Sequence, residues 1–184
     1  MRIISGKYRG KKIFIPKDSF TRPLRDLVKE SIFNILNHSN LLNSKLNESF
    51  VLDLFSGVGS FGLEAISRGM SEVIFFENNI EVLKILKKNC LSICKSNQFK
   101  IYEEDLIHSK LEIEFQNISV VYIDPPYAKY NLTNLLENLS SNIKNTTVIG
   151  LETGVKDNIL IPENLNLLQK KTYGKTIIYI FKLS

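Results

Sequence analysis

The fold of this chain is indicated most clearly by residues 50–69, which have the sequence FVLDLFSGVGSFGLEAISRG. The apolar run at residues 50–54 is long enough for a buried strand, and a glycine-rich turn follows it at once. Three glycines in this turn, Gly57, Gly59 and Gly62, have the spacing G-x-G-x-x-G, and a helical pattern begins between them. A strand, such a turn and a helix in this order predict an α/β sheet that binds a ligand at the carboxyl end of the strand.

The alternation of strand and helix continues through most of the chain. Apolar runs rich in β-formers predict strands at residues 50–54, 72–77, 99–103, 118–123 and 147–152. Amphipathic runs predict helices at residues 60–68, 80–96 and 131–143, with a short one near Ile107. Two more β-rich runs, at residues 167–172 and 175–182, flank Tyr173-Gly174 and predict an antiparallel hairpin. We therefore expect an α/β fold: a mainly parallel sheet with helices on both faces and an antiparallel C-terminal hairpin.

The length of 184 residues predicts one domain with a small extension. We expect a basic N-terminal hairpin and helix at residues 1–40 and the main domain at residues 41–184. The sequence has no apolar run long enough to span a membrane, and its first residues lack the apolar core of a signal peptide. The expected location is the cytoplasm.

The two cysteines, Cys90 and Cys94, lie four positions apart in a predicted helix, which is not the spacing of a zinc ribbon. The only histidines, His38 and His108, are far away in the sequence. We therefore expect free thiols packed in or near the core, and no metal.

Positive charge is concentrated near the N-terminus. Residues 1–30 hold nine Lys or Arg and three acids, a net charge of +6, so the rest of the chain carries −1 of the total of +5. This concentration predicts a contact with a polyanion. Two alternatives would have the same charge: a solvated face, or a flap that covers a cofactor bound by the main domain. The candidate RNA-binding residues are Lys7, Tyr8, Arg9, Lys11, Lys12, Arg22 and Arg25.

The predicted local structure gives some of these residues a second interpretation. Short β-like runs at residues 2–4 and 12–15 predict a hairpin, in which Tyr8 is expected either to stack on RNA or to pack. Arg22-Pro23 opens a predicted helix at its first turn. Arg22 is therefore expected to bind an RNA phosphate or a cofactor carboxylate, or simply to start the helix.

Acids at the ends of the early strands indicate which cofactor the glycine turn binds. Glu77 ends the next strand, 20 positions after Gly57, where an acid can accept bonds from ribose hydroxyls. Asp53 precedes the turn and suits a ligand with an ammonium group, such as a methionine moiety; the alternative is a carboxylate that caps the loop. Asp105 follows the third strand and is expected either to accept a bond from an adenine amine or to be one of several surface acids. The candidate cofactor-binding residues are Asp53, Phe55, Ser56, Gly57, Gly59, Gly62, Glu77, Asn78, Asp105 and Leu106.

A second motif, Asp124-Pro125-Pro126-Tyr127, follows the apolar run at residues 118–123, at the same predicted edge of the sheet. The prolines stiffen the loop and remove two backbone donors, which leaves the Asp124 carboxylate and the Pro125 carbonyl as acceptors and Tyr127 as a flat face. Two acceptors beside an aromatic ring suit a planar heterocycle with an exocyclic amine. Together with the glycine turn, the motif predicts an enzyme that methylates a base amine from S-adenosylmethionine, with these four residues as the catalytic candidates.

The chain as a whole resembles the bacterial methyltransferases of 16S ribosomal RNA that form N2-methylguanosine, the RsmD type. The resemblance rests on residues 2–12 (RIISGKYRGKK), 22–36 (RPLRDLVKESIFNIL), 53–69 and 124–127 (DPPY). It implies a seven-stranded Rossmann-like class I methyltransferase fold with S-adenosylmethionine as the donor. It also implies that the acceptor is a guanine of 16S rRNA, either free or in a small-subunit assembly particle.

This chain departs from the family pattern at a few positions. The family usually has Thr at the position of Leu24, Arg at the positions of Leu27 and Lys29, and Ala at that of Ser56. Two of these changes remove or soften a positive contact, while the base-binding motif is intact.

Three other functions share some of these features. An adenine-N6 methyltransferase of DNA or RNA would use the same four-residue motif, and an NAD-dependent oxidoreductase would share the glycine turn. A non-enzymatic RNA-binding assembly factor would also have the basic N-terminus.

Overall fold

The computed structural model describes residues 1–16, 26–38, 41–42, 46–106, 111–126, 132–157 and 159–184. Arg22, Arg25 and Tyr127 lie outside the described residues, as does the short helix predicted near Ile107. The other candidate residues for RNA, cofactor and base contacts are all described.

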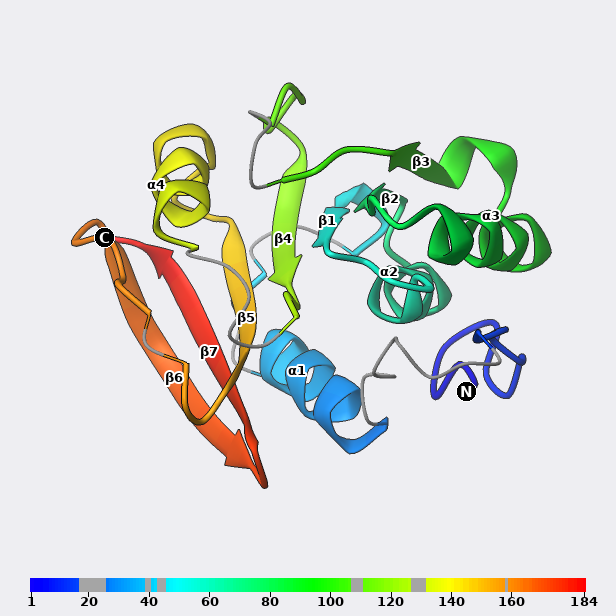
Figure 1. Cartoon of the computed structure of the whole chain (residues 1–184), viewed down its shortest axis with the longest axis horizontal. Coiled ribbons are helices and arrows are strands. Elements are labelled where there is room, and N and C mark those ends of the chain that lie inside the picture. Colours follow the sequence, from blue (N-terminus) through cyan, green and yellow to red (C-terminus); the bar gives the residue numbers. More distant parts are fainter. Residues whose placement is uncertain (17–25, 39–40, 43–45, 107–110, 127–131, 158) are drawn as a thin grey trace.

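The described residues form a seven-stranded sheet in the order β3-β2-β1-β4-β5-β7-β6 (Figure 1). The strands are β1 (Phe50–Leu54), β2 (Glu72–Phe76), β3 (Phe99–Tyr102), β4 (Ile118–Ile123), β5 (Val148–Gly154), β6 (Leu165–Tyr173) and β7 (Thr176–Leu183). From β3 to β5 all neighbours are parallel, whereas β7 pairs antiparallel with both β5 and β6. The expected mainly parallel sheet with an antiparallel C-terminal hairpin is therefore confirmed.

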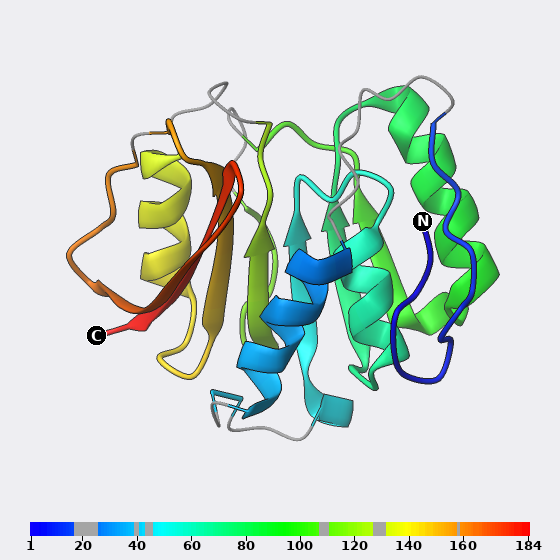
Figure 2. The same cartoon turned by 90° about the horizontal axis from the view of Figure 1, so that it is seen from below.

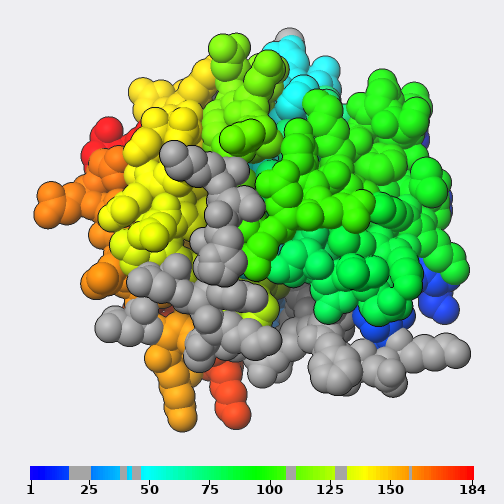
Figure 3. Space-filling view, turned by 45° about the horizontal axis from the view of Figure 1, so that its top comes forward, coloured from blue at the N-terminus to red at the C-terminus, as the bar shows by residue number. Residues whose placement is uncertain are grey.

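Helices cover both faces of this sheet, as expected. The α-helices of the described part are α1 (Asp26–His38), α2 (Ser60–Ser67), α3 (Ile80–Ile93) and α4 (Thr133–Asn142), and short 3-10 helices lie at Leu46–Glu48 and Ser96–Gln98. One apolar cluster joins α1, α2 and α3 to one face of the sheet, and a second joins α4 to the other face. Figure 1 shows α4 on one side of the strands and α1 and α2 on the other. Figure 3 shows the surface on which α4, in yellow, and the region of α3 and β3, in green, are both visible.

The alternation of side chains along the central strands explains the two clusters. In β4, Val120 and Tyr122 belong to the cluster with α1 to α3, while Val121 and Ile123 belong to the cluster with α4. All four side chains are at most 2% exposed. Burial of one such side chain stabilises the fold by roughly 1.5–3 kcal/mol. The apolar run that predicts β4 is therefore also what holds the two helical layers to the sheet.

Helix α3 ends earlier than its apolar pattern predicts. Its start is capped by Asn79, whose side-chain oxygen accepts bonds from Glu81 N at 3.0 Å and Val82 N at 3.2 Å. The pattern predicts a helix to residue 96, but α3 ends at Ile93 because Cys94 is extended, with φ −95° and ψ 158°. A backbone conformation, which the apolar pattern does not encode, sets this boundary.

The N-terminal segment contains less β-structure than the sequence predicts. The expected hairpin is present in a short form: Arg2 and Lys12 form one antiparallel bridge, and backbone bonds run from Ile3 N to Lys11 O at 2.9 Å and from Ile13 N to Met1 O at 3.0 Å. The segment buries Ile3 and Ile13, both 0% exposed, in the cluster with α1 to α3. The short segment is thus held both by backbone bonds of its own and by packing on the helices. The division of the chain near residue 40 stays a prediction.

Candidate functional site

The carboxyl ends of β1, β2 and β4 bring the two sequence motifs together. Leu54, the last residue of β1, pairs in register with Phe76 of β2 and Ile123 of β4. The residues that follow these partners, Glu77 and Asp124, therefore flank the start of the glycine turn. A backbone bond from Asp124 N to Leu54 O at 3.3 Å ties the two motifs to each other. The predicted cofactor half and the predicted base half thus lie side by side at the edge where α/β sheets bind ligands.

The glycine turn is a strained loop that is tied to the neighbouring strand. Phe55 has a φ of 57°, in the left-handed region that bulky side chains rarely adopt. Ser56 fixes the turn to β2, because its N–H donates to Phe76 O at 2.9 Å and its Oγ donates to the same oxygen at 3.1 Å. Gly59 N in turn donates to Ser56 O at 2.9 Å. Backbone strain that is held in place in this way is frequent at ligand sites.

The three glycines of the turn have different surroundings. A Cβ on Gly59 would lie 2.6 Å from Leu86 Cδ1, and one on Gly62 would lie 2.5 Å from Phe75 Cε1. At Gly57, with a φ of 55°, no described atom beyond the adjacent residues lies within 4 Å of such a Cβ. Gly59 and Gly62 therefore allow α2 to pack closely on its neighbours, and Gly57 is the glycine that leaves room for a ligand. Cofactor contacts at all three stay predictions.

Glu77 is held against the turn by backbone donors. Its Oε2 accepts a bond from Gly57 N at 2.8 Å, and its Oε1 accepts bonds from Asn78 N at 3.0 Å and Asn79 N at 2.9 Å. The Glu77 side chain is half-buried, and Asn78 is exposed. A carboxylate offers about four acceptor positions, so Glu77 keeps acceptor capacity toward a ligand at this edge.

Asp53 is buried behind the turn and is only 1% exposed. Its Oδ2 accepts a bond from Gly62 N at 2.9 Å, which is the loop-capping contact that the sequence also allowed. Burial raises the pKa of Asp53 to about 8; the bond from Gly62 opposes this shift, and the Glu77 carboxylate adds to it. The contact between Asp53 and a methionine ammonium stays a prediction.

Two buried polar groups that the motifs do not include lie on β4 and β5 beside Asp124. Tyr122 OH donates to Glu152 Oε2 at 2.7 Å, and the two residues are 2% and 6% exposed. Tyr122 stacks on Phe61 with 4.0 Å between ring centroids, and Phe61 stacks on Phe33 at 4.9 Å. Burial, and then the carboxylates of Asp124 and Glu152, raise the pKa of Tyr122, so its hydroxyl stays protonated. The alternation of side chains along a strand could have indicated that Tyr122 lies on the same face as Asp124, because the two residues are two positions apart.

The base-binding motif is described as far as Pro126. Asp124 is half-buried, Pro125 is buried and Pro126 is exposed. The two expected acceptors, the Asp124 carboxylate and the Pro125 carbonyl, therefore belong to the same edge as the glycine turn. The catalytic roles of these residues and of Tyr127 stay predictions.

The residues after β3 divide between the surface and the core. Asp105 is half-buried, whereas Leu106 is 6% exposed and belongs to the apolar cluster on the α4 face. The nearby Glu103 is exposed and forms an ion pair with Lys87 at 2.6 Å. This ion pair gives Glu103 a surface role of its own, and the contact of Asp105 with an adenine amine stays a prediction.

The basic N-terminal residues lie on the surface near α3. Lys7, Arg9, Lys11 and Lys12 are exposed, and Figure 2 shows their segment, in dark blue, beside α3. Tyr8 is half-buried against the apolar cluster, with Lys7 Nζ 5.3 Å and Lys11 Nζ 5.5 Å from its ring centroid. Tyr8 thus has the packing contact that the sequence allowed, while RNA contacts of all five residues stay predictions.

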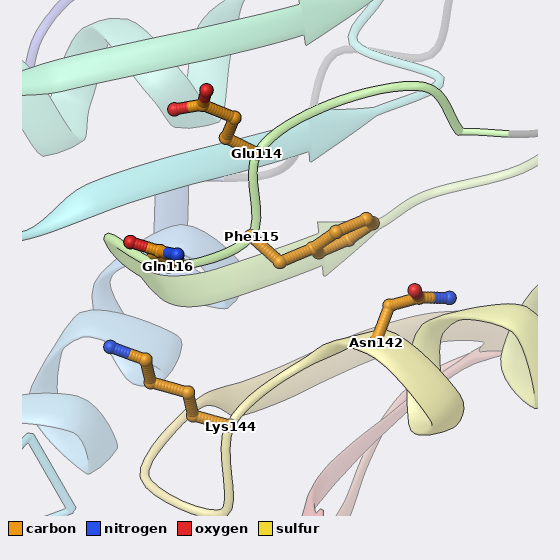
Figure 4. Close-up of a pocket in the computed structure, with 5 residues that line it drawn as sticks. All are labelled: Glu114, Phe115, Gln116, Asn142 and Lys144. Atoms are coloured by element: carbon orange, nitrogen blue, oxygen red, sulfur yellow. The ribbon is translucent and has the colours of Figure 1, made fainter.

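A pocket at the opposite edge of the sheet has a different character (Figure 4). It is lined by Glu114, Phe115, Gln116, Asn142 and Lys144. These residues come just before β4, from the last residue of α4 or from the loop between α4 and β5, so they lie at the amino ends of the strands, away from both motifs. In Figure 4 the Glu114 and Lys144 side chains lie on opposite sides of Phe115. Because ligands of parallel sheets bind at the carboxyl ends, we place the candidate site at the other edge.

Cys90 and Cys94 lie at the end of α3 as free thiols, the first buried and the second half-buried, as expected. Burial raises the pKa of Cys94 to about 11, with Lys11 acting in the opposite direction, so the thiol is protonated near neutral pH. Within the described ranges, no three His, Cys, Asp or Glu side chains are grouped so that they could hold a metal ion. In the same part of the chain, no helix combines the length and the apolar character needed to cross a bilayer.

Comparison with known proteins places the chain in a family. Residues 1–182 match the family described as Conserved hypothetical protein 95. The chain belongs to this family. One of its relatives, the ribosomal RNA small subunit methyltransferase D of Haemophilus influenzae, is 34% identical over 95% of this chain and 89% of its own length. The resemblance to the RsmD type is thereby confirmed.

Solved structures share the fold. The yhhF protein of Escherichia coli is 26% identical, with a TM-score of 0.83 over 100% of this chain and 98% of its own. An RNA methyltransferase of Salinibacter ruber, solved in complex with S-adenosyl-L-homocysteine, is 15% identical, with a TM-score of 0.64 over 88% of this chain and 94% of its own. The expected Rossmann-like class I methyltransferase fold is confirmed.

Proposed function

We propose that this protein transfers a methyl group from S-adenosylmethionine to the exocyclic N2 amine of a guanine in 16S rRNA. Its substrate is the free rRNA or a small-subunit assembly particle in the cytoplasm, where such particles form. The observation that carries the proposal is the backbone bond from Asp124 N to Leu54 O at 3.3 Å, because it sets the amine-binding motif against the glycine turn. Membership of the family, and the name of the Haemophilus influenzae relative, support the same class of substrate.

The residues at the carboxyl edge fit this cofactor. Three backbone donors orient the Glu77 carboxylate, and its remaining acceptor capacity suits a ribose hydroxyl. No described atom beyond the adjacent residues lies within 4 Å of a Cβ on Gly57, and Asp53 keeps the turn in shape through Gly62. The cofactor supplies an electrophilic methyl group on a sulfonium. The Salinibacter ruber neighbour, which has the same fold, binds the product form of this cofactor.

The acceptor side has to expose a lone pair on a poor nucleophile. The lone pair of guanine N2 is delocalised into the ring, so bonds from its two N–H groups to the Asp124 carboxylate and the Pro125 carbonyl favour a pyramidal nitrogen. Tyr127 stacks on the base, which is worth about 1–3 kcal/mol per base, after the base has been unstacked from the RNA. In-line attack then depends on positioning more than on a strong base, because the nitrogen becomes acidic once it is alkylated.

The test is the methylation state of 16S rRNA, read by mass-mapping of its nucleosides. A deletion strain should lack one N2-methylguanosine, and the wild-type protein should restore it in vitro. The Asp124→Ala variant should restore none while it binds S-adenosylhomocysteine as the wild type does. Glu163→Ala, which changes an exposed acid in the loop before β6, is the matched control and should be fully active.

Each rival function predicts a different outcome of the same test. An N6-methyladenosine product would favour the adenine methyltransferase. Calorimetric binding of NAD, with no binding of S-adenosylhomocysteine, would favour the oxidoreductase. Full complementation of the deletion strain by Asp124→Ala would favour a non-enzymatic assembly factor.

A further inference from the structure

Helix α1 carries a fully buried cation, Lys29, that contacts two other parts of the chain, the N-terminal segment and α2. Its Nζ lies 3.4 Å from Arg2 O, 3.2 Å from Ser60 Oγ and 3.6 Å from Glu64 Oε2. Both Lys29 and Glu64 are 0% exposed. Ser60 is the first residue of α2 and comes directly after Gly59 of the glycine turn. One ammonium group therefore connects the N-terminal segment, α1 and the start of the helix that follows the turn.

Glu64 fastens the N-terminal segment from the other side of this ion pair. Its Oε2 accepts a bond from Ile4 N at 2.8 Å, and its Oε1 accepts a bond from Ser5 N at 2.9 Å. Arg68 Nε also donates to Oε1, at 2.8 Å. Among the described residues, the buried carboxylate thus receives two backbone N–H groups and two cations. The N–H groups belong to residues 4–5, one cation belongs to α1, and the other is Arg68 at the C-terminal end of α2.

Ser67 extends the same attachment by one helical turn. Its Oγ donates to Ser5 O at 2.6 Å and accepts a bond from Tyr8 N at 2.9 Å, and its carbonyl accepts a bond from Lys7 N at 2.7 Å. A Cβ on Gly6 would lie 1.9 Å from Ser67 O, so the segment touches the helix backbone at this point. We call residues 2–8 the strap. We call the exposed residues Lys7, Arg9, Lys11 and Lys12 the strap cations. Lys7 lies within the strap and the other three follow it closely, so their position depends on where the strap sits on α2.

Stability alone is a weak reason for such a buried ion pair. Taking two charges out of water is costly, and apolar residues of similar volume often replace a buried pair without loss of stability. What an apolar pair would not reproduce is the simultaneous contact of one atom with Arg2 O, Ser60 Oγ and Glu64 Oε2. The buried ion pair is therefore better explained as a device that fixes the distance between the strap and the glycine turn than as a source of stability.

We propose that Lys29 and Glu64 are positioning residues that hold the cations at the end of the strap at a fixed place relative to the glycine turn, and so align bound RNA with the methyl donor. This inference rests on the proposed function, since it assumes that RNA binds the strap cations and that the turn binds the cofactor. A misplacement of about 1 Å between two reacting groups can lower a rate by on the order of 100-fold. The loss should therefore fall on the methyl-transfer rate and not on either affinity.

The experiment compares Lys29→Met with Lys29→Arg, which keeps a cation, in the full-length protein. Small ribosomal subunits from the deletion strain are the RNA probe, and S-adenosylhomocysteine is the cofactor probe. For Lys29→Met we expect a single-turnover rate at least tenfold lower at saturating RNA and cofactor, with both dissociation constants within about twofold of the wild type. Lys29→Arg should regain most of the rate. Lys84→Met, which breaks the exposed pair with Glu81, is the matched control and should keep the wild-type rate.

A double-mutant cycle distinguishes positioning from a general loss of structure. In a background with Lys7, Arg9, Lys11 and Lys12 changed to Ala, Lys29→Met should lower the rate no further, because the groups that it positions are gone. Multiplicative losses would show that Lys29 acts in another way and would overturn the inference. Ser60→Ala cuts one contact of Lys29 while the ion pair remains, so it serves if Lys29→Met does not fold. It should lower the rate in the same direction and should also have no effect in the four-Ala background.

The outcomes also separate this inference from the proposed function. If the wild-type protein methylates no ribosomal RNA, the proposed function fails. If the wild type is active and Lys29→Met keeps the rate of the Lys84→Met control, the positioning role alone fails. Equal losses of rate and of S-adenosylhomocysteine affinity in Lys29→Met would likewise overturn it, because they would indicate a damaged cofactor site.

Discussion

Two buried carboxylates, Asp53 and Glu64, lie in the same strand–turn–helix unit and are held in different ways. Asp53 accepts a bond from the backbone of Gly62, nine positions away. Glu64 accepts two backbone bonds from the strap, about 60 positions away, and pairs with Lys29 and Arg68. The first carboxylate shapes a local turn, and the second joins distant parts of the chain.

This difference has an energetic consequence. A buried carboxylate whose donors are neutral is costly to ionise, whereas one that faces two cations has its charge compensated. Asp53 should therefore respond to pH, and Glu64 should respond to the loss of its partners. The cofactor edge and the strap attachment, although both depend on a buried acid, are thus expected to fail under different conditions.

The largest expected effect is the pH dependence that Asp53 gives to stability. Its pKa is raised from 3.8 to about 8, so its stabilising contribution is full below about pH 4 and is lost as the pH rises through about 8. The free energy of unfolding of the wild type relative to Asp53→Asn should fall by several kcal/mol between these values, since one pKa unit is about 1.4 kcal/mol. Urea unfolding of both proteins at several pH values measures this. A constant difference would show that Asp53 is ionised in the folded protein at neutral pH.

The next effect is the loss of Glu64. Glu64→Ala leaves the N–H groups of Ile4 and Ser5 without their acceptor and leaves Lys29 as a buried cation without its carboxylate. Breaking a buried pair in this way costs about 3–5 kcal/mol, which urea unfolding at pH 7 would measure. Glu81→Ala, which removes an exposed acid paired with a lysine, should cost at most about 1 kcal/mol. Similar losses in both variants would show that water replaces the bonds of Glu64 and that the two acids are equivalent.

The third effect concerns how closely the strap lies on α2. Gly6 and Gly10 have φ values of 79° and 84°, so an alanine at either position incurs a similar left-handed cost, about 1–2 kcal/mol. The Cβ at Gly6 would also meet Ser67 O at 1.9 Å, while nothing described lies within 4 Å of the one at Gly10. Gly6→Ala should therefore lower the free energy of unfolding by about 1–3 kcal/mol more than Gly10→Ala. Equal losses would mean that the strap shifts freely on the helix.

The contrast between local contacts, such as that of Asp53, and contacts between distant segments, such as those of Glu64, explains how much of the structure the sequence could predict. The strands of the sheet follow from apolar runs such as the one in β4, because alternate side chains face two separate clusters. The glycine turn follows from a local motif. The motif did not reveal that Gly59 and Gly62 have packing neighbours from other elements, since Leu86 and Phe75 come close only in the folded chain.

Contacts between distant segments account for what the sequence could not show. Asn89, in the middle of an amphipathic helix, is 0% exposed because its amide donates to Phe14 O and Val58 O and accepts a bond from Phe14 N. No local pattern distinguishes such an amide from a solvated one. The bond between Tyr122 and Glu152 is of the same kind, since it joins two strands that are 30 positions apart. Lys29 also belongs here: the sequence marked it only as a position where the family usually has Arg, and gave no sign that it is fully buried.

A third acid, Glu77, sharpens the comparison because it is only half-buried and faces the ligand edge. Glu77→Ala should weaken binding of S-adenosylhomocysteine by about 1–3 kcal/mol, since the ribose loses an acceptor and the turn loses its bond to Gly57. Isothermal calorimetry measures this, with Glu81→Ala as the control at the start of the following helix. Unchanged affinity in Glu77→Ala would show that the ribose lies elsewhere and that Glu77 only supports the turn.

The smallest effect expected on the folded protein comes from the strap cations, because they are exposed. A variant with Lys7, Arg9, Lys11 and Lys12 changed to Ala should fold and bind S-adenosylhomocysteine, yet its RNA affinity should fall and depend less on salt. Each lost phosphate contact should reduce the slope of log affinity against log salt by about 0.7–0.9. Filter binding of 16S rRNA over a range of salt concentrations measures the slope.

The matched control carries the same change of charge at the other end of the sheet. Its four substitutions, all to Ala on or next to β6 and β7, are at Lys170, Lys171, Lys175 and Lys182. If the strap is a clamp for a polyanion, only the N-terminal variant loses salt dependence. If the strap is a flap over the cofactor, that variant instead loses affinity for S-adenosylhomocysteine and keeps its salt slope. Equal slopes in both variants would mean that net charge, and not the place at which Glu64 holds the strap, governs the attraction to RNA.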